Sequence, residues 1–122
     1  MRLLALIGVL TLMVASGAIA QAQMTVREFN QIAANAPRDP SALLRPSVRR
    51  AANAVQGAFE AARAEEAAAR RAGRAPPFCM PERIRLSPDE IVARMQAVPA
   101  ARQNQTLNQA VRAWMVERYP CR

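Results

Sequence analysis

The stretch FCMPERIRLSPDEIV, residues 78–92, contains both a cysteine and the clearest helix start in the chain. Ser87 can act as the N-cap, Pro88 suits the first helical position, and Glu90 completes a capping box. The residues before Ser87 are partly apolar but have no regular period, so we expect an irregular segment that lies on the core. This segment contains Cys79, one of only two cysteines in the sequence. Its apolar residues are Phe78, Met80, Ile84 and Leu86.

The second cysteine, Cys121, lies in RYPCR at the far end of the C-terminal region. Two helices are expected between the cysteines, one from Ser87 to Pro99 and one that ends before Pro120. Because their connection is short, we expect an antiparallel helical hairpin, which would bring Cys79 and Cys121 together at its open end. The resulting disulfide would close a loop of about 40 residues and contribute about 4 kcal/mol in the chain-entropy model.

The other chemical uses of the cysteine pair have little support in the sequence. The chain has no histidine, and two thiolates alone make a poor zinc site. No CxxC redox motif is present. Without histidine, Ser-His-Asp and Cys-His catalysis are excluded, and the four glycines form no phosphate-binding loop. We therefore expect no enzymatic activity, no cofactor and no metal site.

The N-terminal residues 1–22 have the pattern of a secretory signal peptide, with cleavage after Ala20 or Ala22. Arg2 gives a basic start to an apolar run that is shorter than the ~20 residues a transmembrane helix needs. Export to the periplasm or outside the cell would place the cysteines where a disulfide forms and persists. We expect residues 23–122 to form the mature domain, without a stable membrane span.

The first part of the mature chain predicts one helix and one shorter helical turn. Thr25 and Glu28 have capping-box spacing, and Pro37 ends the helix that they begin. Asp39 can cap a following turn in which Pro40 takes the first position.

The longest helix is predicted to begin after Ser47 as its N-cap and to end at Gly73. Its apolar residues repeat at spacings of three and four, which indicates one buried face. Beyond Ala62 this pattern fades, so residues 61–77 are expected to be an exposed helix end and a proline-rich connector. Gly57 costs about 1 kcal/mol relative to alanine and indicates either close packing or a bend. The predicted apolar stripe comprises Val48, Ala52, Val55, Phe59 and Ala62.

Together these segments predict an all-α fold, a small bundle of about four helices with one disulfide closing the C-terminal helical hairpin. No segment has the alternating pattern of a strand. Trp114 is interpreted as a core anchor of the last helix rather than as a binding residue. Asn104 is the expected cap of that helix.

The charge of the chain restricts its partners. It has 17 basic residues, all arginine, against 9 acidic residues, and Arg2 contributes one unit of the net charge of +8. A basic protein suits nucleic acid, an anionic membrane or an acidic protein partner, and export argues against nucleic acid. The pairs Arg49–Arg50 and Arg70–Arg71 are interpreted as solvated faces, and the arginine and alanine bias is also typical of a GC-rich genome.

Residues 76–121 resemble the Rap/Tai immunity-protein family, whose members protect bacteria from amidase effectors of type VI secretion. Family members typically read Phe-Cys-x-Pro, then a capped helix, a proline, and a helix that ends in aromatic-Pro-Cys. The matching positions are Phe78, Cys79, Pro81, Pro99, Tyr119, Pro120 and Cys121.

The resemblance implies an exported helical protein that binds and blocks a peptidoglycan-cleaving amidase in the periplasm, as members of the family do, often as dimers. The N-terminal half departs from the family, because no cysteine precedes Cys79 and only AVQGAF around Gly57 is similar to its glycine motif. The polar connector at the hairpin tip is the predicted contact with the partner, since a preorganised tip lowers the ordering cost of binding. The connector residues are Arg102, Gln103, Asn104, Gln105 and Thr106.

Two other function classes stay open. One is a small periplasmic stress protein or holdase, similar in outline to helical acid-stress chaperones that have one disulfide. Because the chain lacks histidine, any acid response would require carboxylate protonation. The other is attachment of arginine-rich amphipathic helices to an anionic membrane surface.

Overall fold

The computed structural model of the protein describes residues 23–122, so the predicted signal peptide lies outside the described residues. These residues form four α-helices and two short 3-10 helices, with no strand among them. The predicted all-α fold of about four helices with one disulfide is confirmed. In chain order the elements are α1 (Val26–Asn35), η1 (Pro40–Leu44), α2 (Pro46–Arg71), α3 (Pro88–Gln96), η2 (Ala100–Arg102) and α4 (Leu107–Arg118).

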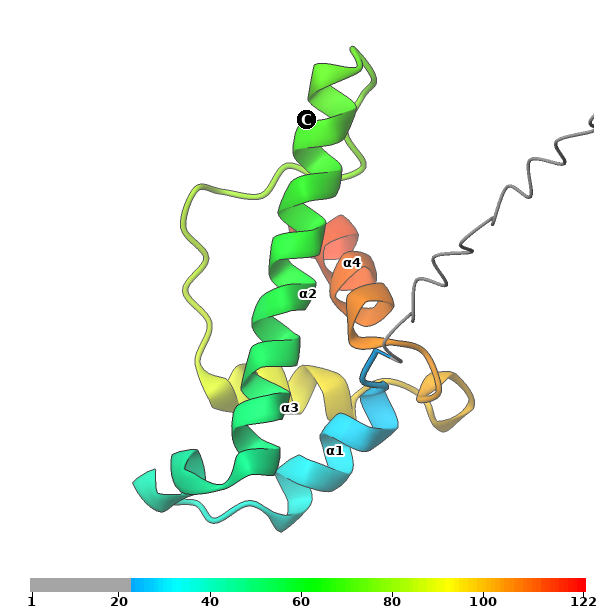
Figure 1. Cartoon of the computed structure of the whole chain (residues 1–122). Coiled ribbons are helices and arrows are strands. Elements are labelled where there is room, and N and C mark those ends of the chain that lie inside the picture. The colour runs from blue at the N-terminus through cyan, green and yellow to red at the C-terminus, as the bar shows by residue number, and fades with distance from the viewer. Residues whose placement is uncertain (1–22) are drawn as a thin grey trace, which may run out of the picture.

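The long helix α2 forms the axis of the molecule, and the other helices lie beside different parts of it (Figure 1). Helix α4 packs on α2, whereas α1 contacts both α2 and α3. Helix α3 packs mainly on α1, so α3 and α4 are not the side-by-side hairpin that the short connection suggested. Residues 72–87, the returning segment between α2 and α3, run back along the molecule without helical structure (Figure 1). Cys79 lies in this segment and Cys121 follows α4, so the disulfide closes a loop that contains both α3 and α4.

Three helix starts agree with the sequence because local side chains determine them. Thr25 caps α1, and its hydroxyl accepts a hydrogen bond from the third amide of the helix. Ser87 and Glu90 form the predicted capping box at the start of α3. Asp39 caps η1 and accepts a 2.8 Å hydrogen bond from a backbone amide two residues later.

Two predicted caps are wrong. Helix α2 begins at Pro46 rather than after Ser47, because proline at the first helical position has a suitable φ angle and needs no amide donor. The cap of α4 is Thr106 rather than Asn104. Thr106 and Gln109 form a complete capping box, for which Asn104 lies too far upstream.

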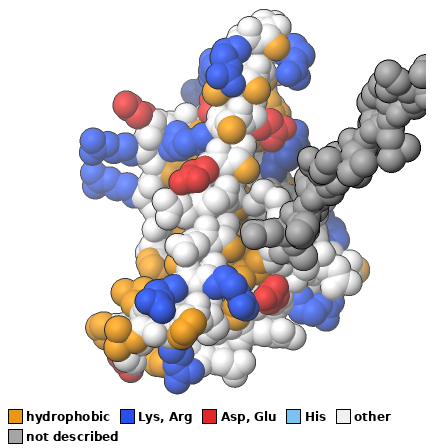
Figure 2. Space-filling view, viewed as in Figure 1, with side chains coloured by type: hydrophobic (Ala, Val, Ile, Leu, Met, Phe, Trp, Pro, Cys, Tyr) orange, Lys and Arg blue, Asp and Glu red, His pale blue; other side chains and the backbone are white. Residues whose placement is uncertain are grey.

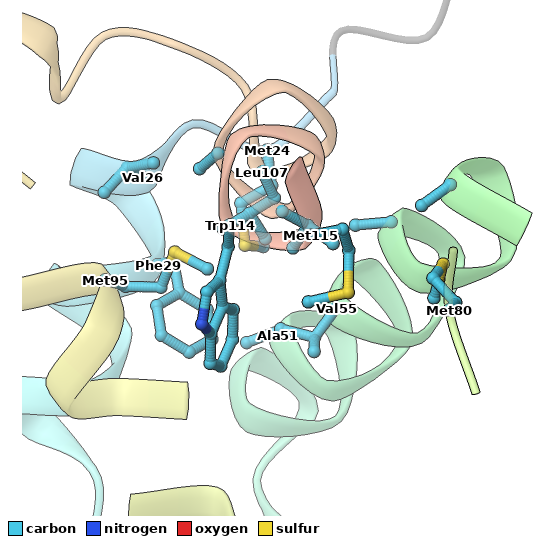
Figure 3. Close-up of a cluster of buried hydrophobic side chains, with 14 of the residues drawn as sticks. Met24, Val26, Phe29, Ala51, Val55, Met80, Met95, Leu107, Trp114 and Met115 are labelled. Atoms are coloured by element: carbon cyan, nitrogen blue, oxygen red, sulfur yellow. The ribbon is translucent and has the colours of Figure 1, made fainter. Parts of the chain in front are cut away.

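The core lies where α1, α3, α4 and the returning segment meet α2 (Figure 3). Trp114 is 5% exposed and its ring centroid lies 6.0 Å from that of Phe59, which confirms that it is a core anchor. The apolar residues of the returning segment also cover the core, as predicted. The largest fully buried side chains are Phe78, Met95, Leu107, Met115, Val26 and Val111.

The buried face of α2 consists mainly of alanine and differs from the predicted stripe. Val55 and Ala62 belong to both, but Ala52 is exposed. The prediction of an exposed helix end beyond Ala62 is wrong for one face, where Glu66 and Ala69 are buried. Small side chains at a helix contact allow the two axes to lie close together. The buried positions are Ala51, Val55, Ala58, Ala62, Glu66 and Ala69.

Helix α2 ends in a Schellman motif at Gly73, as its glycine predicted. Gly73 has a φ of 69°, and its amide donates to the carbonyl of Arg70 at 3.1 Å. The amide of Arg74 donates to the carbonyl of Ala69 at 2.9 Å. Gly57, by contrast, has open space around its Cβ position, so the close packing offered as one explanation for it is wrong.

Candidate protein-binding surfaces

The two motif elements that resemble immunity proteins meet in one joint. Cys79 and Cys121 form the predicted disulfide, with 5.0 Å between their Cα atoms. The amide of Cys79 donates a 2.7 Å hydrogen bond to the carbonyl oxygen of Tyr119. Phe78, directly before the first cysteine, has no exposed surface. The joint therefore fixes the C-terminus and the returning segment to each other through covalent, polar and apolar contacts.

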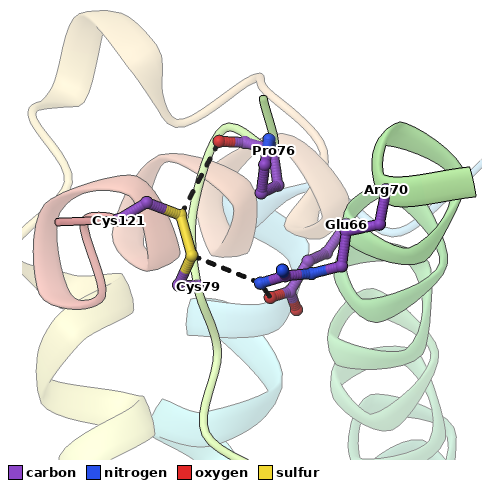
Figure 4. The surroundings of a disulfide bond; sticks show 5 residues. All are labelled: Glu66, Arg70, Pro76, Cys79 and Cys121. Carbon is purple, nitrogen blue, oxygen red and sulfur yellow. Dashed lines mark hydrogen bonds and ion pairs between the residues drawn. A yellow bond between two sulfur atoms is a disulfide. The ribbon is translucent and has the colours of Figure 1, made fainter. Parts of the chain in front are cut away.

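Arg70 of α2 contacts this joint while it forms an ion pair within its own helix (Figure 4). Arg70 Nη2 lies 3.1 Å from Glu66 Oε1, and the Glu66 side chain is only 12% exposed. The same nitrogen lies 3.4 Å from Cys79 Sγ. On the other side, Cys121 Sγ lies 3.7 Å from the carbonyl oxygen of Pro76, a contact only, since a disulfide sulfur carries no hydrogen. These contacts hold the end of α2 against the disulfide.

The prolines of the motif shape the backbone. Pro81 is exposed, and its carbonyl oxygen accepts a 3.1 Å hydrogen bond from Arg63 of α2. Pro99 precedes η2 as its N-cap. Pro120 is exposed and follows Tyr119, the C-cap of α4. These prolines lie at three separate places along the backbone and do not line a common pocket.

The connector of residues 102–106 packs against the start of α1. The carbonyl oxygens of Gln103 and Gln105 accept hydrogen bonds from the amides of Arg27 and Val26, at 2.9 and 3.0 Å. These amides belong to the first residues of α1, which have no acceptor within their own helix. The connector backbone therefore completes a helix end.

The connector side chains divide into structural and exposed groups. Gln103 donates to the carbonyl of Val98 at 3.2 Å, and Thr106 caps α4. Asn104 is exposed, and its Oδ1 accepts a 3.1 Å hydrogen bond from Arg27 Nε. Arg102 is also exposed. Of the predicted binding residues, Arg102 and Asn104 are thus exposed, whereas Gln103, Gln105 and Thr106 are half-buried.

Among residues 23–122, the pKa values of two carboxyl groups are shifted, and both shifts are downward. A hydrogen bond from Arg94, together with its positive charge, lowers the pKa of Glu117. Hydrogen bonds from the side chain and amide of Ser41 lower the pKa of Asp39. A general acid at neutral pH needs the opposite shift. Arg94 also lies over the Trp114 ring, 5.6 Å from its centroid, so this ion pair covers a core residue.

Residues 23–122 contain no group of three or more cysteine, aspartate or glutamate side chains placed to hold a metal ion. Over the same residues, every helix is too short or too polar to cross a bilayer.

A groove of about 370 Å³ lies between α1 and the N-terminal part of α2. Ile32 and Val48 contribute apolar surface to it. The Glu28–Arg50 salt bridge, with 3.0 Å between charged atoms, lies on its wall. Arg45 lines the groove as well and reaches a backbone carbonyl at the end of α1. The remaining lining residues are Gln31, Asn35, Ala36 and Ser47.

Two exposed leucines directly precede Arg45 of this groove. Leu43 is 63% exposed and Leu44 is 78% exposed. Figure 2 shows apolar side chains gathered at the end of the molecule that carries η1, with arginines beside them. Sequence reasoning missed these leucines, although adjacent leucines in a turn confined by Pro40 and Pro46 are a usable signal. In a 3-10 turn, successive side chains point in different directions, so a single packed face cannot bury both.

No family model matches the chain, and no curated protein and no solved structure is significantly similar to it. The relationship to immunity proteins therefore stays a prediction from the motif.

Proposed function

We propose that the mature chain is an exported protein-binding module that inhibits a peptidoglycan amidase, in the manner of an immunity protein against a type VI secretion effector. The strongest support is the joint of Phe78 and Cys79 with Tyr119 and Cys121. A motif whose two elements are 42 residues apart corresponds to a single structural unit. The two separated parts of the motif are therefore in contact in the structure, as is expected when a sequence motif preserves a structural feature of a family.

The joint also has a physical role in such a function. A small domain with an alanine-rich core has little stability to spare, and the disulfide restricts its unfolded chain. A rigid surface loses less conformational entropy when it binds, which favours a tight inhibitor. Export to an oxidising compartment fits this use of the cysteines.

The first test is capture from the compartment in which the protein is proposed to act. Mature protein of residues 23–122, with its disulfide intact, would be immobilised and exposed to periplasmic extract from the source organism. We expect a cell-wall amidase to be retained and identified by mass spectrometry. Repeated capture of no hydrolase, together with the absence of an amidase or secretion gene near the coding gene, would argue strongly against the proposal.

A holdase is the second candidate, and the exposed pair Leu43 and Leu44 is the observation that favours it. Exposed apolar surface can bind unfolded clients without a defined partner. A holdase would suppress aggregation of several unrelated clients between neutral and acid pH. An amidase inhibitor would protect none of them, so one light-scattering assay separates the two functions.

A further inference from the structure

We propose that the partner binds where Leu43 and Leu44 adjoin the groove between α1 and α2, and that it presents an acidic segment with apolar side chains. We call this site the leucine–groove surface. The inference rests on the proposed function for the identity of the natural partner, while the chemistry is read from the surface itself. The surface comprises Ile32, Leu43, Leu44, Arg45, Val48 and Arg49.

The apolar half of the surface has unused binding capacity. Leu43 and Leu44 are two of the three large hydrophobic side chains classed as exposed in residues 23–122. Removing apolar surface from water is favourable, so leaving two adjacent leucines in water has a cost. Beside them, Ile32 and Val48 line the groove and can contact an inserted side chain. A partner with apolar side chains would cover both features at once.

The charged half of the surface contains arginines without a salt bridge. Arg45 and Arg49 form none with any carboxylate of residues 23–122. The charge of Arg45 only assists the hydrogen bonds from Ser41 in lowering the pKa of Asp39. The two nearby carboxylates are already engaged, since Glu28 pairs with Arg50 and Asp39 accepts hydrogen bonds from Ser41. Guanidinium groups bind carboxylates in a bidentate geometry, so the complementary segment is acidic.

The shape and charge of the surface favour a protein segment over the other occupants. The groove is concave with a volume of about 370 Å³, which suits inserted side chains better than a flat lipid surface. A second copy of the chain would place arginines of one molecule against those of the other. An acidic, apolar protein segment meets neither objection.

A titration with defined peptides tests this inference without any amidase. The 15N-labelled mature protein would be titrated with a helical peptide that carries leucines on one face and glutamates elsewhere. Two matched peptides would replace glutamate by lysine or leucine by serine. We expect amide shifts centred on Leu43, Leu44 and Val48 with the first peptide, and at least about tenfold weaker binding of the other two.

Variants locate the site on the protein. Leu43→Ser combined with Leu44→Ser, or Arg45→Glu combined with Arg49→Glu, should weaken binding of the leucine–glutamate peptide about tenfold or more. Val116→Ser is the matched control, because Val116 is a large exposed hydrophobic residue, 40% exposed, on α4. Arg85→Glu is the charge control, because Arg85 is exposed and lies in the segment between α2 and α3, outside both surfaces. Thermal melts would verify that each variant is folded, and the two controls should bind as the wild type does.

Several outcomes would overturn the inference. Equal binding of the lysine peptide would show that charge does not select the partner, and shifts centred on the connector would place the site there. Shifts at Leu43 and Leu44 on simple dilution of the protein would identify a second copy as the occupant. Binding to anionic phosphatidylglycerol vesicles but to no peptide would identify a lipid surface. None of these results affects capture of an amidase, so the failure of either proposal is recognisable.

Discussion

Gly57 and Gly73 are glycines of the same helical region, yet a methyl group should have opposite effects at the two positions. Gly57 lies within α2, and a Cβ there meets nothing within 4 Å. Gly57→Ala should therefore raise the free energy of unfolding by about 1 kcal/mol. Gly73 has a φ of 69°, so Gly73→Ala should lower it by about 1 kcal/mol. Urea denaturation of both variants checks the pair, and the same sign for both would contradict this explanation.

The pKa of Glu117 gives a prediction about acid stability. Arg94 lowers this pKa below the ordinary value of 4.5, so the ion pair stabilises the folded state above that pH. The contribution is lost as pH falls through the lower pKa of the folded protein. Arg94→Gln should return the pKa of Glu117 towards 4.5, measured by NMR titration of the carboxyl group. An unchanged pKa in this variant would show that another group causes the shift.

Single residues divide into those that local sequence determines and those that it does not. Ser87 and Glu90 could be predicted because their contacts lie within four residues of each other. The roles of Gln103 and Gln105 could not be predicted from local sequence. Their carbonyl oxygens accept hydrogen bonds from the first amides of α1, which lies far away in the sequence. The exposure of Leu43 and Leu44 could not be predicted either, because it depends on how η1 packs against α2.

At the scale of the element, the alanine face of α2 determines how closely α4 can approach. Ala62 is 3% exposed, so Ala62→Leu should overpack this contact and cost about 1–3 kcal/mol in the free energy of unfolding. Ala61→Leu on the exposed side is the matched control and should be nearly neutral. The comparison is made by thermal or urea unfolding. Equal stability of the two variants would mean that the two helices do not pack through alanines.

Which helices pack against each other was harder to predict than where each helix begins and ends. Prolines and caps in the sequence indicate where helices begin and end, because these signals act locally. Helix α4 packs on a face of α2 that consists mainly of alanine. Because alanine is small and only weakly hydrophobic, a search for large apolar side chains does not detect this face beyond Ala62. The two cysteines were paired correctly, although α3 and α4 do not form the expected side-by-side hairpin.

At the scale of the whole molecule, the disulfide should decide whether the domain folds well. Replacing both Cys79 and Cys121 by serine should cost about 4 kcal/mol by the chain-entropy model. For a small domain, this is a large part of the total free energy of unfolding. The measurement is urea denaturation of the variant beside the oxidised protein. A loss below about 1 kcal/mol would show that helix packing alone sustains the fold.

The sequence could predict a function only through a family resemblance. A binding surface is formed by residues from several segments, so no local sequence pattern reveals it. The aromatic and cysteine residues of the motif lie in the joint, whereas its prolines lie along the backbone outside it. The leucine–groove surface is formed by α1, η1 and α2, outside the C-terminal motif. The proposed binding surface therefore lies apart from the joint, although α1 and α2 also contribute side chains to the core.

Titration of peptidoglycan amidase activity with the oxidised mature protein tests the proposed inhibition most directly. The amidase would be the one captured from periplasm or encoded beside the gene, and release of peptide from purified peptidoglycan would be followed. Activity should fall to zero near one equivalent of the wild-type protein, whereas the Leu43→Ser/Leu44→Ser variant should require a large excess. Full amidase activity in the presence of excess wild-type protein would contradict the proposed inhibition.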